Sequence, residues 1–310
     1  MRVIITGGTG LIGSALTKRL TKDGHEVVVL TRNPAKVTDL PSGARAVAWD
    51  ATTSKGWESE IDGAGAVVNL AGESIAGDGF LPSRWSPARK DRILNSRVNA
   101  GKAVTEAFSR AQNKPSVLIQ SSAVGYYGTQ DETNQPPLTE SAPAGTDFLA
   151  DVCVKWEAST AAVEAMGVRR AIIRTGIVLS FEGGTLPLLA LPYQFFGGGP
   201  IGSGKQPFPW IHIDDEVAAI CHLIETPTAN GAFNLSAPGV LTNNEFGKVL
   251  GKVIGRPHYL PAPGFAFKLG FGELADALLL RGQRAVPERL PTVGYTFHYP
   301  DAESALKALY

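Results

Sequence analysis

Short runs of β-branched and other apolar residues alternate with longer helical patterns in the first half of the chain. Runs such as 66–70 (Ala-Val-Val-Asn-Leu) are apolar at almost every position, which is typical of strands covered on both faces. The alternation predicts βαβ units on one parallel sheet. The expected strands are 2–6, 26–31, 44–49, 66–70, 116–121 and 170–174, and the expected helices are 11–23, 87–110, 147–166 and 214–226.

The pattern changes after residue 182. Glycine, proline and aromatic residues gather at 195–200 and 207–210, and regular elements return at 232–235 and 243–254. Residues 260–310 have the pattern of a small, mainly helical cap. The expected fold is therefore α/β: a Rossmann-like doubly wound parallel sheet with helices on both faces, followed by a smaller, mainly helical C-terminal domain on the substrate side. We place the first domain at 1–182, with 205–235 contributing to it, and the second at 183–310.

A glycine-rich loop follows the first expected strand and opens the first expected helix. It satisfies both Gly7-x-x-Gly10-x-x-Gly13 and Gly8-x-Gly10-x-x-Gly13. Glycines allow the tight turn and the close approach of a pyrophosphate, and the helix offers free N–H groups to the phosphates. The alternative is a purely structural turn, but the strand–loop–helix context favours a dinucleotide site. The expected contacts are Gly7, Thr9, Gly10, Leu11, Ile12 and Gly13.

The ends of the next strands extend this site. The second strand ends in Thr31-Arg32, where NAD-specific sites carry an acidic residue. A hydroxyl and a guanidinium suit a 2′-phosphate, so we expect NADP, although Arg32 is also placed to be a solvated turn residue. Asp50 is suited to contact adenine or to cap a turn. Small residues after the fourth strand let the ribose approach the backbone at Leu70, Ala71, Gly72 and Glu73.

Composition narrows the class of protein. The 310 residues carry 29 basic and 29 acidic side chains, so a zero net charge argues against broad nucleic-acid or anionic-lipid binding. The two cysteines, Cys153 and Cys221, lie far apart, which argues against a disulfide framework and a metal site. We expect a monomer or homodimer that binds a small-molecule substrate, without nucleic-acid or membrane partners. Its expected location is cytoplasmic, or an organelle stroma if a transit peptide was removed.

Longer motifs carry a family resemblance along essentially the whole chain. The chain resembles the extended short-chain dehydrogenase/reductases, and within them the atypical epimerase-family branch with its own C-terminal domain. The motifs are Trp85, Ser96-Arg97, 121–128 (Ser-Ser-Ala-Val-Gly-Tyr-Tyr-Gly), Lys155-Trp156-Glu157, 199–204, 209–213 and 282–284. The resemblance implies NADP binding, with contacts from Thr31, Arg32, Leu70, Ala71, Arg92, Arg97 and Ser121, and with residues 176–178, including Val178, beside the nicotinamide.

The same resemblance implies a catalytic serine after the fifth strand and a Tyr-x-x-x-Lys pair on the next helix. Ser122 matches the serine, unless it only bonds within the turn, and Lys155 lies in the expected region, where it also suits the cofactor ribose. Asp151 stands four residues before Lys155, where the family has tyrosine. Three explanations stay open: Tyr126 or Tyr127 supplies the phenol, although both suit packing; Asp151 is the base; or the site binds NADP without turnover.

The substrate is not identified by any motif. In related nucleotide-sugar enzymes, arginines of the C-terminal half hold the diphosphate, and this chain offers Arg281, Gln283-Arg284 and Arg289. Arg289 is equally placed to form a surface ion pair. His212, between two isoleucines, is expected in the core rather than in catalysis. We therefore predict an NADP-dependent oxidoreductase or epimerase that acts on a small carbonyl or sugar-like molecule. The alternative is a catalytically silent NADP-bound regulatory or interaction scaffold.

Overall fold

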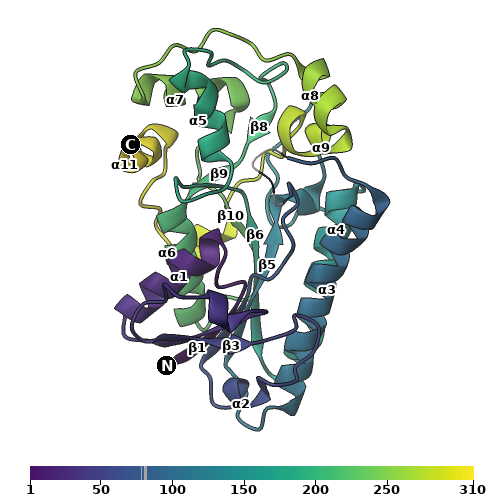
Figure 1. Cartoon of the computed structure of the whole chain (residues 1–310), viewed down its shortest axis with the longest axis vertical. Coiled ribbons are helices and arrows are strands. Elements are labelled where there is room, and N and C mark those ends of the chain that lie inside the picture. The colour runs from purple at the N-terminus through teal and green to yellow at the C-terminus, as the bar shows by residue number, and fades with distance from the viewer. Residues whose placement is uncertain (78, 80–81) are drawn as a thin grey trace.

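A seven-stranded parallel sheet forms the centre of the molecule (Figure 1). We describe residues 1–77, 79 and 82–310 from a computed structural model. The strand order is β10-β6-β5-β4-β1-β2-β3, so the order in which successive strands are added reverses between β1 and β4, the switch point at which doubly wound sheets bind ligands. The strands are β1 (Arg2–Thr6), β2 (Glu26–Thr31), β3 (Ala44–Ala48), β4 (Ala66–Asn69), β5 (Val117–Ala123), β6 (Arg169–Thr175) and β10 (Gly231–Leu235).

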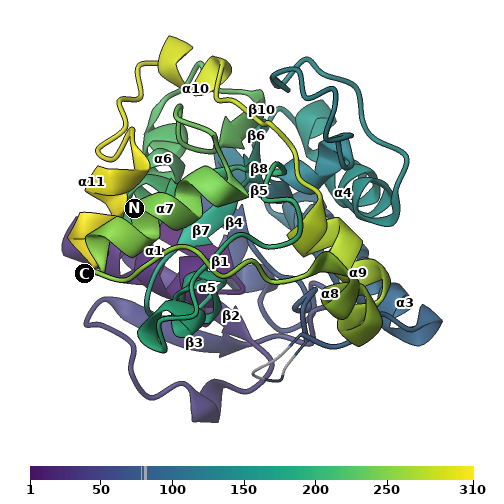
Figure 2. The same ribbon diagram turned by 90° about the horizontal axis from the view of Figure 1, so that it is seen from above.

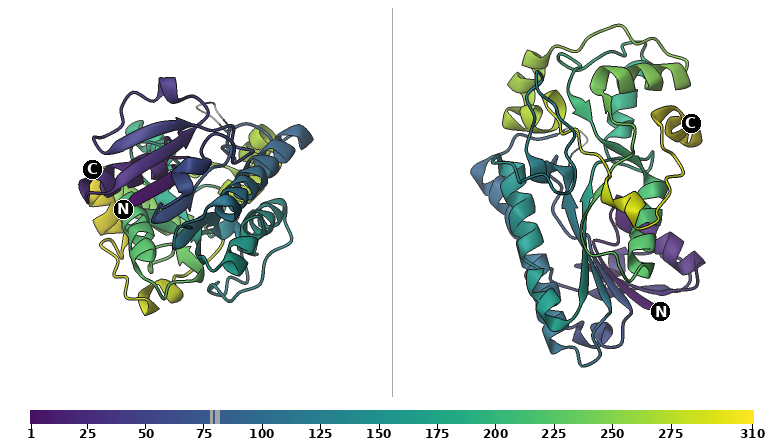
Figure 3. Two further views of the ribbon diagram at one scale, coloured as in Figure 1. Left: turned by 90° about the horizontal axis from the view of Figure 1, so that it is seen from below. Right: turned by 180° about the vertical axis from the view of Figure 1, so that it is seen from behind.

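Helices cover both faces of this sheet, as the view from below shows (Figure 3). One face packs on α1 (Leu11–Lys22) and α6 (Ile213–Glu225) through a core that includes Val29, Val68 and Ile220. The other packs on α3 (Pro87–Arg110) through Val67, Leu118 and Phe108, with the short α2 (Glu58–Ile61) beside it. Helix α4 (Phe148–Ala158) lies beside α3, after the single turn η2 (Val124–Tyr127). The expected Rossmann-like class is confirmed.

One expected helix is shorter than predicted. The pattern at 147–166 gives α4, which ends at Ala158, and a separate 3₁₀ segment, η3 (Ala161–Met166). Arg170 accounts for the break, because its guanidinium donates to the Glu157 carbonyl at 2.6 Å and to the Thr160 hydroxyl at 3.3 Å. The carbonyl that the helix end leaves free is satisfied in this way.

Several helices of the second half of the chain lie at the carboxyl ends of the strands (Figure 1), and Figure 2 views the molecule from that side. A separate core joins α5 (Leu186–Gln194), α7 (Asn243–Val253) and α11 (Ala302–Leu309) through Tyr193, Phe246 and Leu306. The other elements are η1 (Pro34–Lys36), β7 (Ile177–Leu179), β8 (Pro207–Phe208), β9 (Trp210–His212), β11 (Leu241–Thr242), α8 (Gly264–Phe271), α9 (Glu273–Ala275), η4 (Asp276–Leu280) and α10 (Arg289–Thr292).

The chain returns to the sheet near its end. Leu290 and Tyr295 pack into the same core as α1 and α6. A boundary at residue 182 therefore separates segments of sequence that share a core, and the two-domain division stays a prediction. In the part of the chain that the structure describes, no helix combines the length and hydrophobicity needed to cross a bilayer.

Candidate functional site

The glycine loop lies at the point where the sheet order reverses. Gly7 has a φ of +68°, and a Cβ there would lie 2.9 Å from the Leu70 carbonyl carbon. A Cβ at Gly8 would lie 2.8 Å from a Val29 methyl, and one at Gly13 would collide with the Gly7 carbonyl. The Gly10 N–H donates to the Gly7 carbonyl at 3.0 Å, and Gly10 begins α1. The loop is thus closed tightly under the free N–H groups of α1, a cradle that fits a pyrophosphate.

Three buried polar side chains connect the two halves of this crevice. The Thr6 hydroxyl donates to Asn69 Oδ1 at 2.7 Å, Asn69 Nδ2 donates to Gln120 Oε1 at 2.9 Å, and Gln120 Nε2 donates to the Ser121 carbonyl at 2.7 Å. Thr6 also accepts the Ala71 N–H at 3.1 Å. Because each donor leads to the next, one chain of hydrogen bonds fixes the backbone at both Ala71 and Ser121. We call Thr6, Asn69 and Gln120 the polar ladder.

The ends of β2 and β3 form the rim of the crevice. Arg32 is exposed, and no acidic side chain of the described residues forms an ion pair with it, so its guanidinium is available to an anion. Asp50 instead caps a turn: its carboxylate accepts from the backbone N–H groups of Thr52 at 2.7 Å and Thr53 at 2.8 Å. The turn-capping alternative for Asp50 is therefore the one observed, and an adenine contact stays a prediction.

The segment after β4 is held by arginines of α3. Arg97 donates to the Glu73 carbonyl at 3.0 Å, and a Cβ at Gly72 would lie 2.9 Å from the Arg97 guanidinium carbon. Burial lowers the pKa of Arg97, which lies over the Trp156 ring. Arg92 is exposed and pairs with Glu73 at 3.2 Å. The structure thus places Leu70 to Glu73, Arg92 and Arg97 together; their contacts to a cofactor remain predictions.

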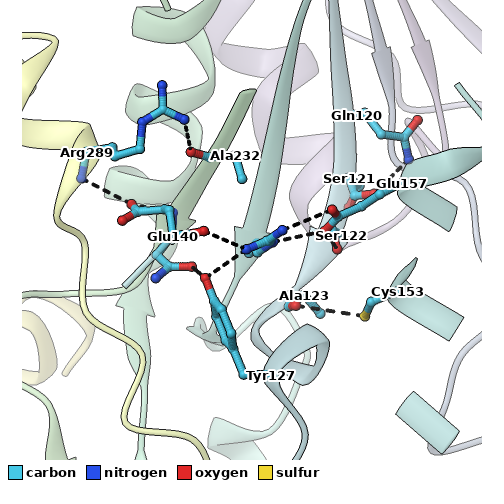
Figure 4. Close-up of polar contacts among 12 residues, drawn as sticks. Gln120, Ser121, Ser122, Ala123, Tyr127, Glu140, Cys153, Glu157, Ala232 and Arg289 are labelled. Carbon is cyan, nitrogen blue, oxygen red and sulfur yellow. Dashed lines mark hydrogen bonds and ion pairs between the residues drawn. The ribbon is translucent and has the colours of Figure 1, made fainter. Parts of the chain in front are cut away.

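Ser122 belongs to a buried network rather than to an open cleft (Figure 4). Its hydroxyl is 3% exposed and donates to Glu157 Oε1 at 2.6 Å. Arg174 on β6 donates to both oxygens of the same carboxylate, at 3.0 and 3.1 Å. Burial by itself lowers the pKa of Arg174, but the bonds and charge of Glu157 raise it above its usual value. The Ser122 hydroxyl therefore donates its hydrogen bond to the buried carboxylate of Glu157 and not to a ligand.

The tyrosine pair joins this network from the other side. Arg174 donates to the Tyr127 hydroxyl at 3.1 Å, and that hydroxyl donates to Asn234 Oδ1 at 2.6 Å. Burial raises the pKa of Tyr127, although Arg174 and Asn234 partly oppose the shift. The guanidinium carbon of Arg174 lies 3.4 Å from the centre of the Tyr126 ring. A buried phenol with a raised pKa is a poor source of tyrosinate, so these contacts favour the packing alternative for both rings.

Lys155 points away from the end of β5. Its ammonium pairs with Asp151 at 2.7 Å, and both side chains are about half exposed on α4. The side of α4 that faces the end of β5 and the η2 turn carries Leu149, Cys153 and Glu157, the acceptor of Ser122. The Cys153 thiol lies 3.8 Å from the Ala123 carbonyl, and a Cβ at Gly125 would lie 3.4 Å from Leu149 Cβ. The expected grouping of Ser122 with Lys155 is therefore not observed. Two residues four positions apart do face the strand end, but they are leucine and cysteine.

Comparisons with known proteins agree with this architecture. The model of the NAD-dependent epimerase/dehydratase family matches residues 3–236, and a domain of unknown function matches residues 262–309. The chain belongs to the NAD-dependent epimerase/dehydratase family. Within it, the epimerase family protein YfhF of Bacillus subtilis is 40% identical over 310 residues, covering 100% of this chain and 98% of its own length. Human epimerase family protein SDR39U1 is 35% identical over 314 residues, covering 100% and 99%.

Solved structures of two family proteins match the whole chain. The crystal structure of human SDR39U1 with NADPH has a TM-score of 0.88 and 33% identity, and the match covers 100% of this chain and 99% of that one. A nucleoside-diphosphate sugar epimerase from Corynebacterium glutamicum has a TM-score of 0.77 and 33% identity, covering 100% of this chain and 58% of that one. The family and the epimerase-family branch expected from the motifs are confirmed.

Within this family member, sequence reasoning missed the charged centre of the site. Glu157 was noted only as part of a motif, and Arg174 only as the end of a strand. A signal was present, because Glu157 lies eight and four positions after Leu149 and Cys153, on the buried side of α4. Glu216 was missed too: it is fully buried in the first turn of α6, accepts from the Thr175 hydroxyl at 2.8 Å, and burial raises its pKa to about 8.

His212 and Val178 lie close in the fold, on paired strands. His212 is buried, accepts the Asp214 N–H at 3.0 Å and packs on Tyr299, as expected for a core residue. Val178 pairs with Ile211 in the β7–β9 ladder and packs against the core that contains α1. Gly184, after β7, approaches the Leu11 side chain, since a Cβ there would lie 3.2 Å from Leu11. The start of α1 is thus bordered by Gly184, six residues after Val178, and contact of residues 176–178 with a nicotinamide stays a prediction.

Proposed function

We propose that this protein binds NADP(H) across the carboxyl ends of β1, β2, β4 and β5. The glycine loop and the first turn of α1 hold the pyrophosphate, and Gly7, Gly8 and Gly13 leave no room for side chains there. Leu70 and Ala71, set in place by the polar ladder, receive the adjacent ribose. The same crevice in human SDR39U1, at 33% identity, belongs to a protein crystallised with NADPH.

The choice of NADP over NAD rests on Thr31 and Arg32. Arg32 is exposed at the end of β2, and no acid within the described residues neutralises it. A guanidinium forms strong bidentate bonds to a phosphate, whereas an NAD site needs an acceptor for the 2′-hydroxyl. An acidic residue is absent from this position of the sequence, which has Thr31-Arg32-Asn33.

We further propose that the bound cofactor does not carry out the hydride transfer usual in this superfamily, in which a catalytic tyrosine transfers the accompanying proton. A nicotinamide supplies or accepts a hydride, and an acid or base must handle the accompanying proton. The observation that supports the proposal is that the side of α4 facing the end of β5 carries Leu149 and Cys153, four positions apart, in place of a tyrosine and a lysine. The hydroxyl groups of Ser122 and Tyr127 donate hydrogen bonds to Glu157 and Asn234 instead. The protein then acts as an NADP(H)-occupied binding or regulatory scaffold.

A second candidate is an NADP-dependent oxidoreductase or epimerase acting on a small carbonyl or sugar-like molecule. One observation favours it: a cavity of about 260 Å³ lies beside Leu149, at the start of α4. A ligand in this cavity would lie beside Leu149, which approaches Gly125 in η2, the turn that follows β5.

One experiment separates the two candidates. NADPH is titrated by its fluorescence, using the wild type and Ser122→Ala. Turnover is then followed by NADPH absorbance with small aldehydes and ketones. With nucleotide sugars and NADP+ it is followed by chromatography of the products, because epimerisation leaves the cofactor unchanged overall. The proposal predicts saturable NADPH binding by both proteins and no turnover by either. Turnover that is lost with Ser122→Ala would establish the oxidoreductase, and failure to bind NADPH would remove both.

A further inference from the structure

The cavity beside Leu149 has walls of two different kinds. Its apolar side consists of Trp85, Phe148 and Leu149, and its polar side comes from α9, η4 and the residue that follows them, Arg281. The Trp85 and Phe148 rings meet edge to face with centres 5.2 Å apart. The indole N–H donates to the Ile75 carbonyl at 2.8 Å, so the ring is fixed and offers only its hydrocarbon surface to the cavity.

The acidic residues of the lining already have partners. Glu273 pairs with Lys90 at 2.5 Å and Asp276 pairs with Lys268 at 3.0 Å. Asp147 caps α4, accepting the Ala150 N–H at 2.9 Å and the Thr129 N–H at 3.0 Å. These carboxylates are therefore neutralised or hydrogen-bonded without a ligand, and none of them needs a cation in the cavity.

Arg281 is different. It lines the cavity, yet its guanidinium has neither a hydrogen bond nor an ion pair with any residue the structure describes. A guanidinium presents five N–H donors in a planar fork that matches a carboxylate. Of the three carboxylates in the lining, Glu273 and Asp276 are paired with lysines, whereas Asp147 has only backbone donors. The remaining negative charge repels a doubly charged phosphate more strongly than a singly charged carboxylate.

We propose that this cavity binds a compact aromatic monocarboxylate. The ring lies against Trp85, Phe148 and Leu149, and the carboxylate accepts hydrogen bonds from Arg281. The volume of about 260 Å³ is just below the roughly 300–1,000 Å³ of pockets for drug-sized ligands, which suits a single ring with one anionic group. The assignment goes beyond cofactor binding, and it holds for either candidate function.

Benzoate is the probe, titrated by calorimetry into the NADPH-saturated protein. We expect saturable binding of one benzoate, at least about tenfold weaker binding to Arg281→Gln because a charge-assisted bond is lost, and little binding of benzyl alcohol or inorganic phosphate. Arg284→Gln is the matched control: Arg284 is a neighbouring exposed arginine outside the lining, and its side chain reaches the Gln135 carbonyl. It should bind benzoate as the wild type does.

The outcomes test the cavity independently of the cofactor. NADPH affinity is measured first, so a failure of the cofactor proposal is seen before benzoate is added. The inference is overturned if benzoate does not bind to NADPH-loaded protein, if Arg281→Gln binds it as tightly as Arg284→Gln does, or if benzyl alcohol binds equally well. Trp85→Leu provides a second arm and should also weaken benzoate binding, because it removes one of the two aromatic rings of the wall and leaves Arg281 in place.

Discussion

Replacing Ser122 with alanine isolates one hydrogen bond of the buried network. The hydroxyl donates at 2.6 Å to a carboxylate, and a bond to a charged group contributes about 1.5–3 kcal/mol to stability. Glu157 keeps both bonds from Arg174, so it is not left unpaired. We therefore expect Ser122→Ala to lower the free energy of unfolding by about 1.5–2 kcal/mol, in the lower part of that range.

Urea unfolding followed by circular dichroism measures this loss, with Ser141→Ala as the control because Ser141 is exposed. The control should stay within about 0.5 kcal/mol of the wild type. In a Glu157→Gln background the cost of Ser122→Ala should shrink, since the charged acceptor is gone and contacting residues are not additive. NADPH affinity should be unchanged. The structural role of the Ser122–Glu157 hydrogen bond is refuted if Ser122→Ala leaves the free energy of unfolding unchanged but abolishes cofactor binding or turnover.

Three further predictions follow from other buried groups. Asn69→Leu removes the centre of the polar ladder and leaves the Thr6 hydroxyl proton and Gln120 Oε1 without partners. It should lower the free energy of unfolding by about 2–4 kcal/mol and weaken NADPH binding, and unchanged affinity would contradict the ladder's positioning role. Glu216 has a pKa raised from 4.5 to about 8, so the unfolded chain ionises before the folded one and stability should fall as pH rises between these values. Glu216→Gln should flatten that slope in urea unfolding from pH 5 to 8; an unaltered slope would show that Glu216 is ionised in the fold. Burial raises the pKa of Cys153 to about 11 and of Cys221 to about 12, so neither thiol should react with Ellman's reagent in native protein at pH 7.5, and fast labelling would refute their burial.

The sheet could be predicted because its signals are local. Strands 2–6 and 26–31 were predicted with the bounds observed, and so was the helix at 87–110. Each of these segments has continuous apolar residues or a clear helical period, and burial on both faces leaves few alternatives. The glycine loop was predictable for the same reason: its residues are adjacent, and their spacing alone predicts the turn.

The residues of α4 that face β5 could not be predicted from the sequence, because they depend on how α4 is rotated about its axis. Asp151-x-x-x-Lys155 and Leu149-x-x-x-Cys153 have the same spacing, and only the packed helix shows which pair faces β5. Residues 128–147, between η2 and α4, have no regular period from which that rotation could be predicted. Glu157 and Arg174 are 17 residues apart, and they meet because α4 packs its Glu157 against Ser122 of β5, the strand next to β6. Their pairing is a consequence of the fold.

The central claim is that Arg32 makes this crevice selective for NADP. The most direct measurement compares the dissociation constants of NADPH and NADH for the wild type, Arg32→Glu and the control Lys22→Glu, which makes the same charge change at the exposed end of α1. The account predicts that Arg32→Glu weakens NADPH binding by about 1–3 kcal/mol and leaves NADH binding and the control unaffected. Equal loss for NADPH and NADH, or no loss for either, would contradict it.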